Sequence, residues 1–235
     1  MAKIMLWSMS IFSAAIFQLF ILLCNVTIAF NLEAVYMYSV NSFPVSLNTG
    51  LDFYQLNVVM NEIRIYLHSS EELITTVVNI NGVTEPLFTY PETLHFKDVR
   101  DLLDKIYLVE WCSGIFLFIY FMACLTRSLK GNDLYFQKLW VAMVNMYKSF
   151  LWVSIIGGIG FAFGAFDLVF YWFHILVFSN DLWMGLPSDR MILLFPSTYF
   201  LHITILIWII SLIEIAVILF VIKRISLRIY SLFNI

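Results

Sequence analysis

Four long apolar runs constrain the fold of this chain more than any other feature. They fall within residues 1–30, 106–126, 149–173 and 199–222. About 20 helical residues are enough to cross the hydrocarbon core of a bilayer, so each run predicts a membrane-spanning helix. The first run is too long for the apolar core of a signal peptide, and no clear cleavage site follows it, so we interpret it as a retained helix.

The composition excludes an ordinary soluble domain. Of the 235 residues, 62% are hydrophobic and only 12% are charged, whereas a soluble domain carries about 25% charged residues. The net charge of -3 argues against a nucleic-acid partner, which would need a basic face. Cys24, Cys112 and Cys124 all lie in apolar runs, where a cysteine is usually a small buried hydrophobe. We therefore predict an all-α membrane protein built on a four-transmembrane-helix bundle.

Lysine and arginine gather beside particular ends of the apolar runs. Segment 127–148 and the tail 223–235 hold most of the clustered basic residues, and Lys3 precedes the first run. Cytoplasmic loops and tails carry an excess of such residues. This rule predicts that both termini and segment 127–148 are cytoplasmic, which leaves residues 31–105 and 174–198 on the outer face.

Segment 31–105 has the pattern of a small folded cap. Apolar residues recur at helical spacing over residues 51–68, which predicts a helix. Residues 73–90 indicate a strand, a turn and a second strand, because Asn81-Gly82 is the usual pair of a hairpin turn. Residues 92–105 predict a short helix that leads into the second apolar run. We expect a small extracellular α+β cap.

His174 begins the second outer segment, 174–198, which proline and aspartate interrupt too often for a span, so we expect it to lie at the membrane interface. An ionisable side chain at the mouth of a span is costly and usually marks a site. Asp167, Tyr171 and His174 are four and three residues apart, hence on one helical face. Either the three side chains form a polar network that packs helices together, or the carboxylate of Asp167 orients His174.

His95 and Asp98 are neighbours on the helix expected before the second span. Two histidines at one membrane surface suggest proton-transfer chemistry. Histidines and carboxylates can also bind zinc, but the chain has no His-Glu-x-x-His helix and no cysteine pair at ligand spacing, so we expect no metal and no cofactor. No Gly-x-Ser-x-Gly motif indicates a serine nucleophile. Glu110 lies near the outer end of the second span and is a candidate to join the two histidines in a water-accessible pocket.

Four glycines, Gly157, Gly158, Gly160 and Gly164, lie close together in the third run. Small residues allow close packing of membrane helices. No strand precedes them and the spacing differs from a dinucleotide-binding fingerprint, so we favour helix packing over nucleotide binding.

Two ordered stretches resemble the lipoprotein intramolecular transacylase family of Gram-positive membranes. The first is His95-Phe96-Lys97-Asp98-Val99-Arg100, before the second span. The second runs from Phe173-His174 to Trp183, with Pro187, Asp189 and Phe195-Pro196 beyond it. The spans and the position of the cap extend the resemblance over nearly the whole chain.

The resemblance implies an intramolecular acyltransferase of the bacterial cytoplasmic membrane. Its substrate would be a diacylglyceryl-modified lipoprotein, whose sn-2 acyl chain moves from the glycerol oxygen to the amine of the N-terminal cysteine. The product would be a lyso-form lipoprotein. We expect a monomer that contacts membrane lipid, with its active site on the extracellular side.

The two histidines, His95 and His174, are the candidate proton-transfer groups, since an imidazole titrates near neutral pH. One would take the amine proton and the other would protonate the leaving oxygen or stabilise the oxyanion, and the sequence leaves their order open. The candidate supporting residues are Asp98, Asp181, Asp167, Tyr171 and Trp183. The rival hypotheses are a non-enzymatic membrane sensor or chaperone with a lipid-facing cap and a small transporter, the latter disfavoured by the lack of an inverted repeat.

Overall fold

The computed structural model describes residues 2–80, 82–131 and 133–233. The chain divides into two compact units. The bundle unit draws on the chain before Thr27, on Leu108–Gly160 and on the chain from Leu206 onward. The cap unit contains Thr27–Tyr107 and Phe161–Ile205.

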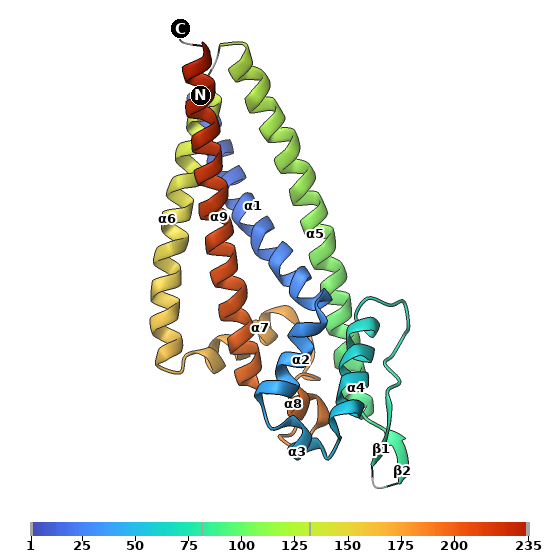
Figure 1. The fold of residues 1–235 in the computed structure, drawn as a ribbon. Helices are drawn as coiled ribbons and strands as arrows, with labels where there is room; N and C mark the ends of the chain where they lie inside the picture. Colours follow the sequence, from blue (N-terminus) through green and yellow to red (C-terminus); the bar gives the residue numbers. More distant parts are fainter. Residues whose placement is uncertain (1, 81, 132, 234–235) are drawn as a thin grey trace. The chain divides into compact units, whose positions relative to one another are not determined.

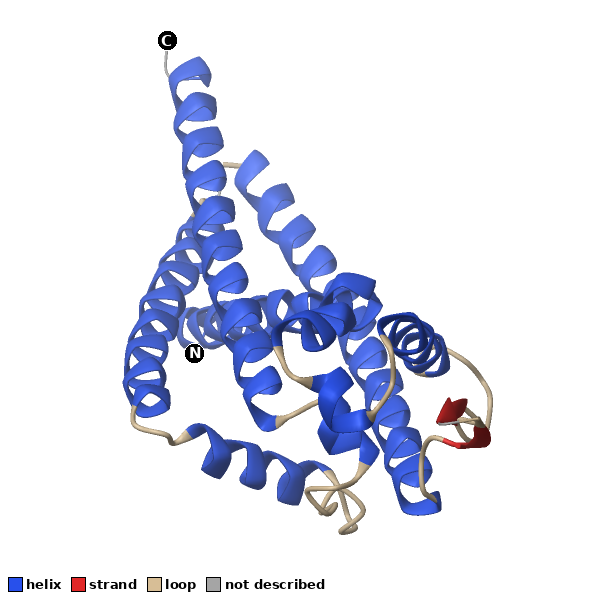
Figure 2. Ribbon diagram, turned by 60° about the horizontal axis from the view of Figure 1, so that its bottom comes forward, coloured by secondary structure: helices blue, strands red, loops and turns tan. Residues whose placement is uncertain are grey.

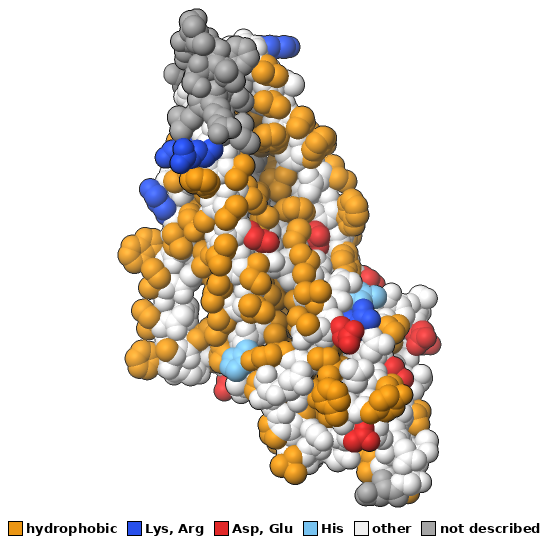
Figure 3. Space-filling view, in the orientation of Figure 1, with side chains coloured by type: hydrophobic (Ala, Val, Ile, Leu, Met, Phe, Trp, Pro, Cys, Tyr) orange, Lys and Arg blue, Asp and Glu red, His pale blue; other side chains and the backbone are white. Residues whose placement is uncertain are grey.

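Four long helices supply the bundle unit (Figure 1). They are α1 (Ala2–Asn31), α5 (Tyr90–Leu129), α6 (Leu134–Ala162) and α9 (Ser197–Phe233). Each is long and apolar enough to cross a membrane, yet only 11 to 22% of its most apolar window is buried inside the protein. The remaining apolar side chains face outward, as Figure 3 shows for the visible face of these helices. Lipid therefore takes the place that a protein core has in a soluble bundle.

Polar contacts join the helices of the bundle unit. Asn25 Nδ2 on α1 donates to Ser211 Oγ at 3.1 Å and to Glu214 Oε2 at 2.6 Å, both on α9. On the other side of α1, Cys24 Sγ lies 3.5 Å from Glu110 Oε1 of α5. Trp208 Nε1 of α9 donates to Ser154 Oγ of α6 at 2.6 Å. Glu110 is thus a partner of α1 within the bundle unit, and its place in the histidine pocket stays a prediction.

Two expected boundaries in the middle of the chain are wrong. Most of segment 127–148 is helical, because α5 continues to Leu129 and α6 begins at Leu134. The third apolar run, 149–173, does not form one helix. The chain breaks at Gly164, whose φ of 81° is in the left-handed region that favours glycine, and a separate helix, α7 (Phe166–Val177), follows.

Gly157 and Gly158 of α6 do not pack closely against another described helix, as the sequence suggests they would. A Cβ added at Gly157 or Gly158 would meet no atom within 4 Å outside the neighbouring backbone. Gly164 ends the helix rather than packing within it. Apolar periodicity could not reveal this break, because the residues on both sides of it are equally apolar.

The cap unit has a core of its own. The elements of this unit include α2 (Glu33–Ser42), α3 (Val45–Thr49), α4 (Phe53–Tyr66), β1 (Val77–Ile80), β2 (Val83–Pro86) and α8 (Arg190–Leu194). On α4, Leu56, Met60 and Ile63 lie at helical spacing and are no more than 1% exposed. They pack in one cluster with residues that include Leu103 of α5 and Leu194 of α8.

The predicted helix and hairpin of the cap are both present. Asp52 and Gln55 form a capping box at the start of α4, which satisfies backbone donors at the helix end. The hairpin, drawn in red in Figure 2, pairs Val77 with Pro86 and Ile80 with Val83. Its strands lie closer to the turn than the sequence suggests, since Leu87 and Phe88 are buried in the core instead. Gly82 has a φ of 85°, and Asn81 lies outside the described residues.

The helix expected over 92–105 is the first part of α5, which continues without a break to Leu129. Forty residues of helix extend about 60 Å, whereas the hydrocarbon core is about 30 Å thick. The apolar run begins only at Ile106, so residues 106–129 alone are long enough to cross the hydrocarbon, and residues 90–105 are not needed for the span. The predicted fold class, an all-α membrane protein with four membrane helices and a small α+β cap, is confirmed.

Candidate active site

The cap unit brings His95 and His174 together. Their ring centroids are 6.2 Å apart with an interplanar angle of 33°. His95 comes from the second turn of α5 and His174 from the last turn of α7, and the two residues are 5% and 7% exposed. The ring of Phe178 contacts both, at 5.2 Å and 5.5 Å. Two imidazoles separated by 79 residues of sequence therefore share one buried site.

A backbone contact fixes how His174 carries its proton. Its Nδ1 lies 2.7 Å from the carbonyl oxygen of Phe170, one helical turn earlier. A carbonyl oxygen can only accept a hydrogen bond, so Nδ1 is the protonated nitrogen. In the neutral ring Nε2 then keeps its lone pair and is free to act as a base.

Aromatic rings hold the imidazole of His174 in place. Trp183 stacks on it at 4.8 Å with an interplanar angle of 29°, and the ring of Phe170 lies 4.3 Å away. Tyr171 contacts Trp183 edge-on at 5.5 Å. This packing restricts the histidine to one orientation and keeps bulk water away from it.

Two buried nitrogens at the site lack a hydrogen-bond partner among the described residues. One is Nδ1 of His95, and the other is Nε1 of Trp183. An unsatisfied buried polar atom costs about 1–3 kcal/mol, so we expect a water molecule or a polar group from outside the chain at each of them. Both atoms belong to rings that contact the His174 ring.

Burial disfavours the charged form of both imidazoles. Helix α7 has 12 residues and extends only about 18 Å, too short to span the bilayer, and His95 precedes the apolar part of α5. Burial, aided by His174, lowers the pKa of His95 from 6.5 to about 4, while Asp98 acts in the opposite direction. Burial also lowers the pKa of His174, which the hydrogen bond to Phe170 partly offsets.

Asp98 reaches the site through a residue that sequence reasoning did not select. Its Oδ2 accepts a hydrogen bond from Asn180 Nδ2 at 2.9 Å. Asn180 Oδ1 in turn accepts from the backbone N–H of Leu182 at 3.0 Å. Asp98 therefore ties α5 to the loop that presents Phe178 and Trp183, and it acts on His95 electrostatically. The place of Asn180 inside the second motif was the available signal.

The other predicted carboxylates are not drawn into the site. The side chains of Asp167 and Asp181 are exposed, and neither has a hydrogen bond or an ion pair within the described part of the chain. The geometry thus gives no support to an orienting role for either. Of the predicted supporting residues, Asp98, Trp183 and Tyr171 are the ones linked to the histidine pair.

Glu92 is a second residue that sequence reasoning missed. It is 3% exposed and accepts hydrogen bonds from Thr89 N at 2.7 Å, Thr89 Oγ1 at 2.8 Å and Met191 N at 2.8 Å. It therefore caps the start of α5 and attaches α8 to it, one turn before His95. Thr89-x-x-Glu92 has the spacing of a capping box, which could have identified it.

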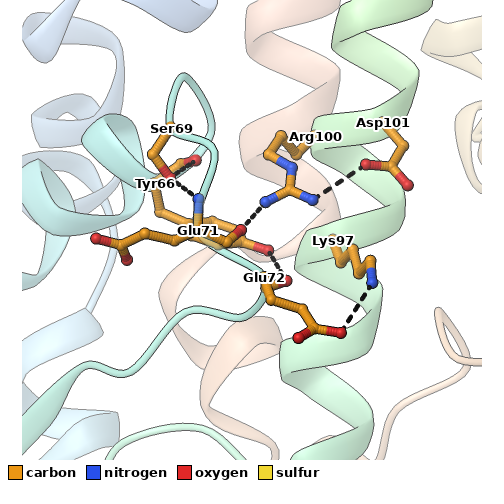
Figure 4. A network of polar contacts seen from close by, with 7 residues as sticks. All are labelled: Tyr66, Ser69, Glu71, Glu72, Lys97, Arg100 and Asp101. Carbon is orange, nitrogen blue, oxygen red and sulfur yellow. Dashed lines mark hydrogen bonds and ion pairs between the residues drawn. The ribbon is translucent and has the colours of Figure 1, made fainter.

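The basic residues of the first motif attach α5 to residues 66–72 of the cap unit (Figure 4). Arg100 donates to the carbonyl oxygen of Glu71, lies 3.3 Å from Asp101 and stacks over Tyr66 at 5.3 Å. Lys97 forms a largely exposed ion pair with Glu72, which contributes little to stability. These contacts fix the helix that carries His95. No group of three or more His, Cys, Asp or Glu suited to a metal occurs among the described residues.

The family described as lipoprotein intramolecular transacylase Lit matches residues 11–200 of this chain. The chain belongs to this family. The match confirms the predicted resemblance and identifies an acyltransferase. Lit is a membrane-integral protein in Bacillus cereus, and with its four apolar helices the present chain is a multi-pass membrane protein. None of the curated proteins matches it.

Solved structures share the fold. The in meso structure of the membrane-integral transacylase Lit from Bacillus cereus has a TM-score of 0.69 at 17% identity, covering 97% of each chain. Two structures of that protein with one histidine replaced, by arginine and by alanine, have TM-scores of 0.65 and 0.64 at 16% identity. They cover 97% of this chain and 93% and 94% of the other.

Proposed function

We propose that this protein transfers the sn-2 acyl chain of a diacylglyceryl lipoprotein to the amine of its N-terminal cysteine. The C–O bond of the ester breaks, a C–N bond forms, the amine loses a proton and the glycerol oxygen gains one. Donor and acceptor belong to one molecule, so positioning them supplies much of the rate enhancement. The pair of buried imidazoles with ring centroids 6.2 Å apart supports this function most directly.

His174 is the base in this proposal. Its Nδ1 is committed to the Phe170 carbonyl oxygen, so Nε2 is available to take the amine proton. The resulting imidazolium can return that proton to the glycerol oxygen as the ester bond breaks, as a general acid. The backbone hydrogen bond to Phe170 becomes stronger when the ring is charged, which supports the intermediate state.

His95 and Trp183 stabilise the oxyanion. A neutral His95 can donate one N–H, and the indole N–H of Trp183 can only donate. Nδ1 of His95 and Nε1 of Trp183 are buried and unpaired among the described residues, as expected of atoms that meet the substrate. Donors aimed at a developing negative charge, in a site that excludes water, lower the barrier to acyl transfer.

The substrate reaches this site from the outer face of the membrane in our proposal. Arg127 lies in the last turn of α5, Lys130 in the turn that follows, and Lys138 and Lys148 in α6; these basic residues favour a cytoplasmic position for this turn and for both termini. The cap unit and its histidines are then extracellular, where mature bacterial lipoproteins carry their lipid. We expect the protein to act as a monomer.

Turnover by histidine variants tests the proposal. Purified protein is incubated with a synthetic diacylglyceryl lipopeptide, and mass spectrometry follows the acyl chain from oxygen to nitrogen. His95→Ala and His174→Ala should each lower kcat by about a hundredfold or more, the usual contribution of general acid–base groups. His68→Ala is the matched control, because His68 contacts the Phe30 carbonyl oxygen, away from the pair. Full turnover by both site variants would refute the proposal.

A further inference from the structure

The two faces of helix α7 differ in exposure. Phe166 and His174, two turns apart on one face, are each 7% exposed. Leu168, Trp172 and Leu176 recur every four residues on the opposite face and are 61, 53 and 81% exposed. A helix at the surface of a soluble protein carries polar side chains on its outward face, so the exposed face of α7 needs an apolar partner.

The packed face holds α7 at the level where two membrane helices end. The ring of Phe166 lies 5.5 Å from that of Phe161 in the last turn of α6, and the ring of Phe170 lies 5.3 Å from that of Phe200 in the first turn of α9. All four residues belong to the cap unit. Phe200 is also the second residue of the fourth apolar run, 199–222. These contacts place α7 at the boundary between the membrane spans and the cap.

The chain stays apolar as it passes from α6 to α7. No polar or charged side chain occurs between Ser154 and Asp167, a stretch that includes the end of α6, the turn at Gly164 and the first residue of α7. In that turn Phe163 is 87% exposed. Turns that face water are rich in polar residues. The lipid-facing surface of α6 therefore continues along the chain onto α7.

A bilayer fits the exposed face of α7 better than a protein partner does. Tyr171, Trp172 and Phe173 are all exposed, and at about 100° per residue these three positions cover about 200° of the helix. Acyl chains can surround such a surface, whereas one protein face covers only part of it. Tyrosine and tryptophan also favour the membrane–water interface. Segment 149–189 has no lysine or arginine, so it offers no cation to an acidic partner.

We infer that α7 is an interfacial helix whose exposed face is docked in the leaflet where α6 ends and α9 begins. Its partner is the acyl and glycerol region of bilayer lipids, without selection for headgroup charge. An interfacial helix buries its apolar face about 5–10 Å into the boundary between headgroups and acyl chains. His174 is then held at the depth of the membrane surface, on the side of α7 that faces the protein. The inference does not rest on the proposed acyl transfer.

Spin labels at single cysteines measure what surrounds α7. The full-length protein, with Cys24, Cys112 and Cys124 replaced by alanine, carries one label at Leu168→Cys or Leu176→Cys and is placed in phosphatidylcholine vesicles. Oxygen concentrates in hydrocarbon and a charged nickel complex stays in water, so the relaxation that each reagent causes reports the surroundings of the label. Both α7 labels should respond more to oxygen than to nickel.

Two control positions calibrate this measurement. Ile156→Cys, at a position 68% exposed on the membrane helix α6, should respond as the α7 labels do, and Glu85→Cys on the exposed strand β2 should respond more to nickel. A stronger response to nickel at both α7 positions would overturn the inference, because water would then surround the helix. Labels shielded from both reagents would overturn it as well, since a second copy of the chain or another protein would then cover the face.

A second measurement keeps the native cysteines. Brominated phosphatidylcholine quenches the emission of tryptophans that contact its acyl chains, so the quenched fraction should fall in Trp172→Phe. Replacing part of the lipid by phosphatidylglycerol should change neither measurement, because the face has no basic residue. An unchanged quenched fraction in Trp172→Phe, or a response that grows with the share of anionic lipid, would contradict the assignment.

Discussion

At the scale of single residues, the site depends on atoms that have a partner and atoms that have none. The contact between His174 Nδ1 and the Phe170 carbonyl oxygen assigns one histidine the lone pair of a base. In the part of the chain that the structure describes, the buried nitrogens Nδ1 of His95 and Nε1 of Trp183 have no hydrogen-bond partner, and we propose that they meet the substrate. A neutral imidazole and an indole are both suited to donate a hydrogen bond without themselves losing a proton near neutral pH.

Trp183→Phe separates the indole N–H from the ring that stacks on His174. The phenyl ring keeps most of the contact but loses the donor. If Nε1 stabilises the oxyanion, kcat should fall by about a hundredfold with KM little changed, as for loss of one oxyanion donor. Tyr171→Phe, which keeps a ring against Trp183, is the control and should retain its kcat. Unchanged kcat in Trp183→Phe would show that the tryptophan only packs.

Both histidines should become charged at a lower pH than a free histidine does. Burial lowers both pKa values, that of His95 from 6.5 to about 4, so the His95 signal should titrate well below pH 6.5 and the midpoint of the His174 signal should also lie below pH 6.5. NMR of protein with labelled histidine measures this, and the signals lost in His95→Ala and His174→Ala give the assignments. Titration of either signal at or above pH 6.5 would contradict the buried, neutral pair.

The same shift affects stability. His95 binds fewer protons in the folded than in the unfolded state between pH 6.5 and about 4. The contribution of the neutral, buried His95 to the free energy of unfolding is therefore complete above pH 6.5. It is lost as the pH falls from 6.5 to about 4.

At the scale of elements, the site requires a long helix, a short helix and a loop to be held together. Glu92 attaches α8 to the start of α5. The hydrogen bond between Asn180 and Asp98 attaches the loop after α7 to a point further along α5. Each contact lies within a few residues of a histidine. Loosening them should displace the rings without removing them.

Exchanging the two partners tests the contact between Asp98 and Asn180. Asn180→Asp places two carboxylates side by side and should lower kcat/KM about tenfold, the cost of roughly 1.4 kcal/mol expected when a hydrogen bond to a charged group is lost. Adding Asp98→Asn restores one carboxylate and one amide and should recover much of the loss. If the double variant shows only the sum of the two single effects, the contact does not position the loop.

Sequence reasoning succeeded where a signal is local and failed where it is not. The four apolar helices, the helix of the cap and the hairpin all follow from periodicity and a turn pair, and the structure contains each of them. The break at Gly164 was missed because apolar residues continue on both sides. The approach of His95 and His174 was expected from their motifs, whereas the bond from Asn180 to Asp98 joins residues 82 positions apart and leaves no local pattern.

At the scale of the whole molecule, the two units of the chain provide two different environments. The bundle unit turns apolar side chains outward to lipid, and a few polar contacts such as Asn25 with Glu214 link its helices. The cap unit has a closed core of its own and carries both histidines. A membrane acyltransferase needs both, since its lipid substrate stays in the bilayer while the reacting ester and amine must be kept from water.

A crossover experiment measures the proposed reaction most directly. Two lipopeptides with different peptide masses, only one of which has an isotope-labelled sn-2 acyl chain, are mixed in equal amounts with the purified protein. Transfer within one molecule predicts that every labelled N-acyl chain is found on the peptide that first carried it. Labelled chains distributed over both peptides, or N-acylation without loss of the chain from glycerol, would contradict an intramolecular shift at the histidine pair.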